Sequence, residues 1–165
     1  VIISTSAGQA VRFNEAECRP MGRAARGVRG VRLRPNDIVV GMDIVCTDDQ
    51  ALLVISQNGY GKITKAANFP SHKRGGVGIK AAVVTGKTGP IITAQTLEAD
   101  ANEALLISKN GQTIRVALKG IPTLGRTTQG VRIMRLGDSD TVSSIGIVQD
   151  TKEDVVEESD GEAEK

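Results

Sequence analysis

Apolar residues in this chain occur as short runs of three to five, separated by turns that carry glycine. Three of these runs precede a turn of the same kind: Val1–Ile3 before Ala7-Gly8, Ala51–Ile55 before Asn58-Gly59, and Ala104–Ile107 before Asn110-Gly111. Asn-Gly between β-branched runs is a strong hairpin signal, because a type I′ turn needs two residues at positive φ. The pattern therefore predicts three β-hairpins, with turns at Gly8, Gly59 and Gly111.

Each hairpin is followed by a loop with proline and glycine and then by two further apolar segments. The first of these begins at a Gly-Val pair, and the second covers Ile38–Val45, Pro90–Gln95 and Val142–Val148. A nearly continuous apolar run indicates a strand that is covered on both faces. Valine and isoleucine together number 32 against 9 leucines, which favours strands over helices. We expect about four strands in each stretch of about fifty residues, and no helix longer than a turn or two.

A twelve-residue segment rich in glycine and arginine recurs along the chain. Gly22–Leu33 returns 103 residues later as Gly125–Leu136, and seven of the twelve positions are identical. A looser copy lies between them at Ser71–Lys80. The alignment of the three copies pairs Gly27-Val28, Gly76-Val77 and Gly130-Val131. A period near fifty residues is typical of propeller blades or solenoid turns.

These patterns predict an all-β, propeller-like fold of repeated four-stranded blades. We place the blades at about residues 1–50, 51–103 and 104–150. Because propellers carry about four to eight blades, three blades make an open arc or part of a longer ring. Residues 151–165 hold seven acidic side chains and few large apolar ones, so we expect a disordered acidic tail there. Such a tail either aids solubility or competes with a polyanion for the basic body.

The net charge of +2 conceals a segregation of charges. Without the tail, 19 basic and 12 acidic side chains remain and give the body a charge of +7, which indicates a polyanionic partner. The sequence has no apolar stretch of roughly 18 residues, the length that a membrane span needs. Cys18 and Cys46 do not form a Cys-x-x-Cys pair, so we expect reduced thiols in a cytosolic protein and no metal site.

The basic residues gather where each loop passes into the Gly-Val strand. Arginines at repeating positions favour a surface for phosphates over a merely solvated loop, because a solvated loop gains nothing from the repetition. The candidate DNA-binding residues are Arg23, Arg26, Arg29, Arg32, Lys62, Lys65, His72, Lys73, Arg74, Lys80, Lys119, Arg126, Arg132 and Arg135. Phosphate contacts do not read sequence, so we expect sequence-independent binding. With only Phe13, Tyr60 and Phe69 to stack on bases, the chain favours duplex over single strands.

The sequence offers no arrangement of residues for catalysis. His72 lacks a carboxylate or nucleophile at a suitable spacing, and Tyr60 lies in a hairpin turn without an acidic metal site. Gly75–Gly78 lacks the following Lys-Ser/Thr and the helix of a P-loop. We therefore expect a binding module without catalytic residues, metal or cofactor of its own.

Four segments resemble a known family: Arg19–Arg23, Arg26–Leu33, Gln57–Lys62 and Gly125–Val131. They are similar to the carboxy-terminal domain of the bacterial DNA gyrase A protein, and the likeness extends over Val1–Val148. The resemblance implies a six-bladed β-pinwheel whose blades exchange strands, here its last three, with duplex DNA wrapped around a basic rim. The family's Gln-Arg-Arg-Gly-Gly-Lys-Gly box is only partly matched, by Lys73–Gly78, which implies that this part wraps DNA poorly on its own.

The same resemblance implies the setting of the module. It would belong to a type II topoisomerase that uses ATP and magnesium to introduce negative supercoils, as an A2B2 holoenzyme with the gyrase B protein in the bacterial cytoplasm and nucleoid. The catalytic residues of that enzyme would lie outside this chain. Two alternatives stay open: the equivalent domain of topoisomerase IV, and a propeller scaffold that binds proteins. Salt-sensitive, sequence-independent DNA binding would separate the scaffold from both topoisomerases.

Overall fold

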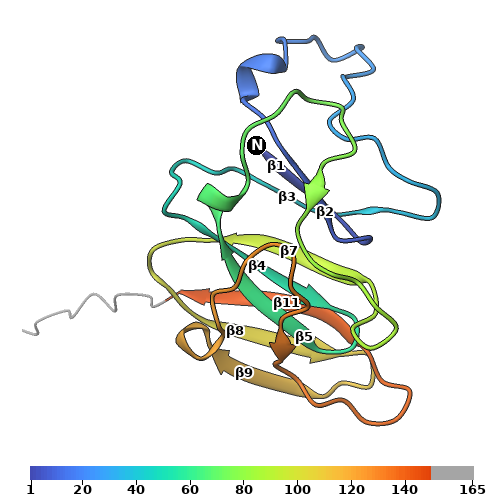
Figure 1. Ribbon diagram of the computed structural model, residues 1–165, viewed down its shortest axis with the longest axis vertical. Coiled ribbons are helices and arrows are strands. Elements are labelled where there is room, and N and C mark those ends of the chain that lie inside the picture. The colour runs from blue at the N-terminus through green and yellow to red at the C-terminus, as the bar shows by residue number, and fades with distance from the viewer. Residues whose placement is uncertain (150–165) are drawn as a thin grey trace, which may run out of the picture.

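The structure, a computed structural model, describes residues 1–149, and the predicted acidic tail lies outside the described residues. Its strands form three antiparallel sheets stacked on one another (Figure 1), as the all-β prediction requires. The first unit contributes β1 (Ile2–Thr5), β2 (Gln9–Arg12) and β3 (Val39–Asp43). The second contributes β4 (Ala51–Ser56), β5 (Tyr60–Lys65), β6 (Ile79–Lys80) and β7 (Ile91–Leu97). The third contributes β8 (Ala101–Ser108), β9 (Thr113–Ala117), β10 (Val131–Arg132) and β11 (Val142–Gln149).

In the described part of the chain, helical structure is limited to one short 3-10 helix in each unit. These helices are η1 (Glu15–Glu17), η2 (Ala66–Asn68) and η3 (Leu118–Gly120). Each follows the second strand of its hairpin, so the three helices occupy equivalent places in the repeat. Within residues 1–149, no helix is long and apolar enough to cross a membrane.

Each unit opens with the predicted hairpin, but the turn is not the predicted type I′. Among the turn residues only the glycine has a positive φ, which is 74° at Gly8, 77° at Gly59 and 84° at Gly111. The N–H of each glycine donates to the carbonyl three residues earlier, so a β-turn is followed by a left-handed glycine. The residue before the glycine needs no positive φ, which is why Ala7 serves as well as an asparagine.

The fourth strand of a blade comes from the next unit along the chain. The strand order is β3-β1-β2-β6 in the first sheet and β10-β5-β4-β7 in the second, so β6 and β10 leave their own units. The third sheet has the order β11-β8-β9, and no strand of the described part lies beside the outer edge of β9. Consecutive units are therefore joined by hydrogen-bonded sheet as well as by packing.

Each of these outer strands pairs with the preceding hairpin in the same register. Ile79 lies opposite Ala10 in the first sheet, and Val131 lies opposite Gly61 in the second. Ala10 and Gly61 both stand two residues after the hairpin glycine. At both junctions the carbonyl of that hairpin glycine accepts the N–H groups of two residues farther along the incoming chain.

This register corrects the alignment of the repeat. The residue before the outer strand is Gly78 in the second unit (φ 82°) and Gly130 in the third (φ 83°). The counterpart of Gly130 is therefore Gly78, and the alignment through Gly76 is wrong by two residues. In every unit the left-handed glycine before the exchange strand then lies 19 positions after the hairpin glycine, and in the first unit it is Gly27 (φ 80°). We call β6, β10 and residues 28–29 the exchange strands; residues 28–29 hold the equivalent position in the first unit but pair with no strand of the described part.

The core lies between the stacked sheets. In β4, Leu52 and Val54 pack in the cluster shared with the first sheet, and Leu53 and Ile55 pack in the cluster shared with the third. The continuous apolar run of β4 thus reflects a strand covered on both faces. Strand β7 contacts both β3 and β11, and these three strands form the inner edge of the stack, which leaves β6 and β10 at the outer edge.

We expect Gly130→Ala to destabilise the protein more than Gly111→Ala. Both glycines have positive φ, so each replacement costs about 1 kcal/mol or more. A Cβ at Gly130 would also collide with the carbonyl oxygen of Gly61, whereas a Cβ at Gly111 would meet no atom within 4 Å. This collision should add about 1–3 kcal/mol to the loss in the free energy of unfolding, measured in urea. Equal losses would contradict the seating of β10 on β5.

Candidate nucleic-acid interface

The loop before each exchange strand lies at the outer edge of the stack. These rim loops, as we call them, are residues 19–27, 70–78 and 122–130. Each begins just after a 3-10 helix and ends at the left-handed glycine. The second rim loop is held by the first unit, because the His72 N–H donates to the carbonyl of Arg12 (2.7 Å). The third is held by the second unit in the same way, from the Leu124 N–H to the carbonyl of Ile63 (2.8 Å).

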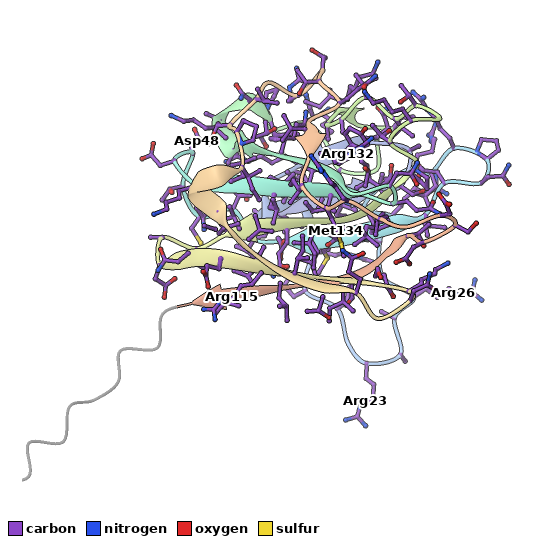
Figure 2. All side chains as sticks on the ribbon, turned by 90° about the horizontal axis from the view of Figure 1, so that it is seen from below. Arg23, Arg26, Asp48, Arg115, Arg132 and Met134 are labelled. Carbon is purple, nitrogen blue, oxygen red and sulfur yellow. The ribbon has the colours of Figure 1, made fainter. Side chains whose placement is uncertain are left out.

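Most of the basic residues predicted from the sequence have exposed side chains. These are Arg23, Arg26, Arg29, Arg32, Lys65, His72, Lys73, Lys80, Lys119, Arg132 and Arg135. Figure 2 shows Arg23 at the tip of a loop that projects from the sheets, with Arg26 also at the periphery of the molecule. The structure thus brings cations from all three units to the surface, most of them on the rim loops and exchange strands.

Long stretches of the sequence around these cations contain no acidic residue. Residues 50–97 hold six lysines and arginines and no aspartate or glutamate, and the same is true of residues 104–137. The ion pairs among the described residues are Arg12–Asp48 and Arg115–Glu103, and neither lies in a rim loop. The charged side chains of the rim loops therefore form no ion pair within residues 1–149, and their positive potential is available to an anion.

Two aspartates accept hydrogen bonds from residues of the hairpin turns. Asp37 accepts hydrogen bonds from the Ser6 hydroxyl and the Ala7 N–H, both at 2.8 Å. Burial raises the pKa of Asp37, but the hydrogen bonds to its carboxylate outweigh this effect and hold the pKa below its ordinary value. Asp140 holds the third turn similarly, through the Asn110 N–H (3.1 Å).

Lys62 differs from the sequence prediction, because its side chain is buried. It is 1% exposed, and its ammonium donates to the carbonyls of Gly125 (2.7 Å) and Arg126 (2.8 Å) and to the Thr128 hydroxyl (3.1 Å). All three acceptors belong to the third rim loop. Burial, together with the positive charge of Arg126, lowers the pKa of Lys62 from 10.5 to about 8. Lys62 therefore fastens the third rim loop to β5 and is not available to a phosphate.

Arg74 and Arg126 are half-buried, and their guanidinium groups bind backbone carbonyls. Arg126 donates to the carbonyl of Lys80, and Arg74 donates to that of Arg29. Both acceptors belong to the unit before the arginine. Part of each guanidinium is therefore already hydrogen-bonded within the protein and is not free to bind a phosphate.

A cluster around Tyr60 adds a cation that the sequence reasoning missed. The guanidinium of Arg132 donates to the Tyr60 hydroxyl (2.8 Å from Nη2), and the Lys87 ammonium lies 5.4 Å from the ring centroid. The hydrogen bond from Arg132, with the charges of both cations, lowers the pKa of Tyr60. Tyr60 thus orients Arg132 on the exchange strand. In the sequence, the feature that could have identified Lys87 as part of the basic surface is its place in residues 50–97, which contain no acidic residue.

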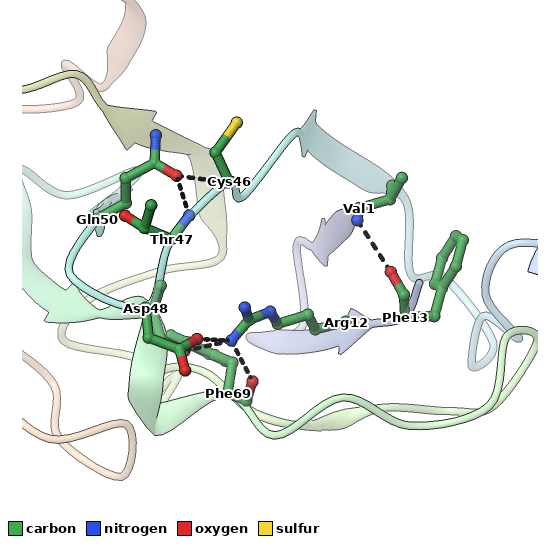
Figure 3. Close-up of polar contacts among 9 residues, drawn as sticks. Val1, Arg12, Phe13, Cys46, Thr47, Asp48, Gln50 and Phe69 are labelled. Carbon is green, nitrogen blue, oxygen red and sulfur yellow. Dashed lines mark hydrogen bonds and ion pairs between the residues drawn. The ribbon is translucent and has the colours of Figure 1, made fainter. Parts of the chain in front are cut away.

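Arg12 shows that a basic side chain near the rim can have a structural role. Its guanidinium pairs with Asp48 (2.8 Å) and donates to the carbonyl of Phe69 (3.1 Å), as Figure 3 shows. It also donates to the carbonyl of Ala66 (3.1 Å). These contacts tie the first hairpin to the second unit. Arg12 was not among the candidate DNA-binding residues, in keeping with this role.

Between about pH 8 and 10.5 we expect the protein to gain stability relative to Lys62→Met. In this window the folded protein has released the Lys62 proton, while the unfolded chain still holds it up to about 10.5. The unfolded state then binds more protons, so the free energy of unfolding rises with pH. Urea titrations across the window measure the difference between the two proteins. A difference that stays flat or falls would contradict a buried ammonium with a lowered pKa.

Comparisons with known proteins account for the threefold repeat. A family model described as DNA gyrase C-terminal domain, beta-propeller, matches residues 1–46, 50–97 and 102–149, one match for each unit. The DNA gyrase A protein of Aminobacterium colombiense is 44% identical over 148 residues, and that of Staphylococcus aureus (strain NCTC 8325 / PS 47) is 37% identical over 159 residues. These alignments cover 90% and 96% of this chain, and 18% of each relative.

Solved structures have the same fold. A structure of the DNA gyrase A C-terminal domain matches with a TM-score of 0.74 at 26% identity, covering 88% of this chain and 49% of that one. The C-terminal domain of DNA topoisomerase IV matches with a TM-score of 0.83 at 21% identity, covering 90% of this chain and 46% of that one, which shows the fold alone. The propeller-like fold of repeated blades is thus confirmed. The chain, which spans 18% of the length of its gyrase A relatives, belongs to the family of DNA gyrase C-terminal domains.

Proposed function

We propose that this chain is the DNA-binding and DNA-wrapping module of a DNA gyrase A protein, and that duplex DNA lies along its outer edge. The observation that carries the proposal is the repeated placement of exposed cations there. Arg29, Lys80 and Arg132 occupy equivalent positions, two residues after the left-handed glycine of each unit. Cations that recur at each unit fit a partner whose charges also recur at fixed intervals, as phosphates do along duplex DNA.

The side chains of the outer edge suit a duplex better than a single strand. Binding of single strands usually relies on aromatic side chains that stack on the bases. Phe13, Tyr60 and Phe69 are 4%, 7% and 1% exposed, so none offers a free ring face to a base. Contacts to phosphate alone position the nucleic acid without reading its sequence. Binding of duplex DNA should therefore be independent of sequence.

In the whole protein, this module would serve an enzyme whose active site lies elsewhere. We propose that it contributes to ATP-dependent negative supercoiling by a holoenzyme with the gyrase B protein, in the bacterial cytoplasm and nucleoid. ATP and magnesium would bind outside this chain. Membership of the gyrase family supports this setting. Gyrase A relatives at 44% and 37% identity favour gyrase over topoisomerase IV, and the solved gyrase A domain matches at 26% identity.

We also propose that further blades of the same kind pack against the first unit, as in a six-bladed ring. Gly41 of β3 faces β7, because a Cβ there would collide with the carbonyl oxygen of Ala94. Met42 and Ile44 therefore point away from the second sheet, and they are 67% and 69% exposed. An exposed apolar surface of this kind suits another blade. This chain covers 49% of the solved gyrase A domain, so the rest of that domain is long enough for three more blades.

The salt dependence of duplex binding tests the proposed function. If about six phosphates are contacted, the logarithm of the association constant should fall with the logarithm of salt concentration with a slope near −5. We expect two labelled duplexes of unrelated sequence to give the same affinity and slope in anisotropy titrations. A response that is flat in salt, or a strong preference for one sequence, would contradict a phosphate-binding edge.

Lys80→Gln should weaken binding to every duplex alike, because it removes one phosphate contact from an exchange strand. The magnitude of the salt slope should fall by about 0.9. Lys109→Gln is a matched control, since Lys109 is exposed and lies in a hairpin turn, outside the rim loops and exchange strands. The control should keep the slope of the parent protein. Equal effects of the two substitutions would mean that net charge, and not the outer edge, governs binding.

A further inference from the structure

Arg74 and Arg126 make the same hydrogen bond at successive junctions between units. Nη1 of Arg74 donates to the carbonyl of Arg29 (2.6 Å), and Nη1 of Arg126 donates to the carbonyl of Lys80 (2.8 Å). The two donors are equivalent, since each lies four residues before the left-handed glycine of its rim loop. The two acceptors are equivalent as well, since each lies two residues after that glycine in the preceding unit. The bond is therefore a property of the repeat.

A backbone hydrogen bond accompanies the arginine at each junction. The Arg32 N–H donates to the carbonyl of Gly76 (2.8 Å), and the Val83 N–H donates to that of Thr128 (3.1 Å). Each donor lies three residues after the exchange-strand cation, and each acceptor lies two residues after the rim-loop arginine. At each described junction, the arginine bond and the backbone bond thus join the exchange-strand segment of one unit to the rim loop of the next.

Other fastenings differ between the two junctions. At the first, the Glu17 carboxylate accepts a hydrogen bond from the backbone N–H of Arg74 (2.9 Å). At the second, buried Lys62 holds Gly125 and Arg126 by their carbonyls. Both junctions share the pairing of β6 or β10 with the preceding hairpin, the backbone bonds described above and the bond from the rim-loop arginine. Among these shared contacts, the arginine supplies the side-chain hydrogen bond between successive units.

We propose that Arg74 and Arg126 are positioning residues that fix the spacing of the exposed cations of successive units. Each guanidinium binds the backbone of a residue, Arg29 or Lys80, whose own side chain is an exposed cation at the outer edge. The bond holds that cation at a set distance from the next rim loop. The proposal rests on the proposed DNA-binding function. It assigns these two arginines, which the sequence placed among the candidate DNA-binding residues, to spacing the exposed cations instead of contacting phosphates.

The stiffness of duplex DNA makes such spacing matter. A duplex keeps its direction over about 150 base pairs, so its phosphates recur at intervals that adapt little to a loose protein. Cations that are held in place before binding lose less conformational freedom on binding. The benefit arises only when one duplex spans two units, because a duplex on a single unit does not cross a junction.

Arg126→Gln and Lys73→Gln make a matched pair, because each removes one positive charge from a rim loop. Binding is measured against salt with a duplex of about 10 base pairs, one helical turn, and with a duplex of about 60. Lys73 is exposed, so its replacement should reduce the slope by about 0.9 with both duplexes. Arg126→Gln should leave the slope with the short duplex unchanged and weaken binding of the long duplex roughly fivefold or more.

Hydrogen exchange in the free protein gives a readout that does not depend on DNA. The Val83 amide donates across the junction that Arg126 braces. We expect Val83 to exchange faster in Arg126→Gln and at the parent rate in Lys73→Gln, because only the former loosens this junction.

Three outcomes would overturn the proposal. If Arg126→Gln reduces the slope with the short duplex as much as Lys73→Gln does, Arg126 is a phosphate contact. If Arg126→Gln binds the long duplex as tightly as the parent protein, or leaves Val83 exchange unchanged, the brace does not set the spacing. A parent protein that binds neither duplex would overturn the proposed DNA-binding function, and with it the positioning role. The parent titration therefore separates the two failures.

Discussion

The seating of β6 and β10 on the preceding hairpins is the contact on which the rest of the structure depends. Gly78 and Gly130 make it possible, because both hold a positive φ where the facing carbonyl leaves no room for a Cβ. The exchanged strand joins consecutive sheets by hydrogen bonds. It also carries the loop before it to the outer edge of the neighbouring blade. A repeat that buried its fourth strand in its own sheet would not link the units in this way.

The sequence was sufficient for features that local chemistry decides. Hairpin turns, continuous apolar strands and the period near fifty residues follow from residues close together in the chain, and the structure contains all three. The exchange strands could be anticipated only from the family resemblance, because β6 and β10 are two residues long and pair with residues 69 to 72 positions earlier. The second copy of the repeat has glycines at 75, 76 and 78, and only sheet pairing identifies Gly78 as the equivalent one.

The candidate interface was predictable as a surface but not residue by residue. Lys62 and Lys65 lie on the same strand and look alike in the sequence, yet Lys62 is buried under the third rim loop and Lys65 is exposed. That difference depends on a loop more than sixty residues away. Arg126 repeats Arg23, but its guanidinium binds a backbone carbonyl of another unit. Repetition of a charged residue thus marks either a phosphate contact or a brace between units, and only the structure tells them apart.

The most direct test of the account is hydrogen exchange of the chain with and without a long duplex, read segment by segment. The account predicts that DNA slows exchange in all three rim loops and in the exchange strands, because one duplex follows the outer edge across successive units. Strands β3, β7 and β11 at the inner edge should keep their rates. Protection confined to the inner edge, or to a single rim loop, would contradict a duplex that follows the repeated cations.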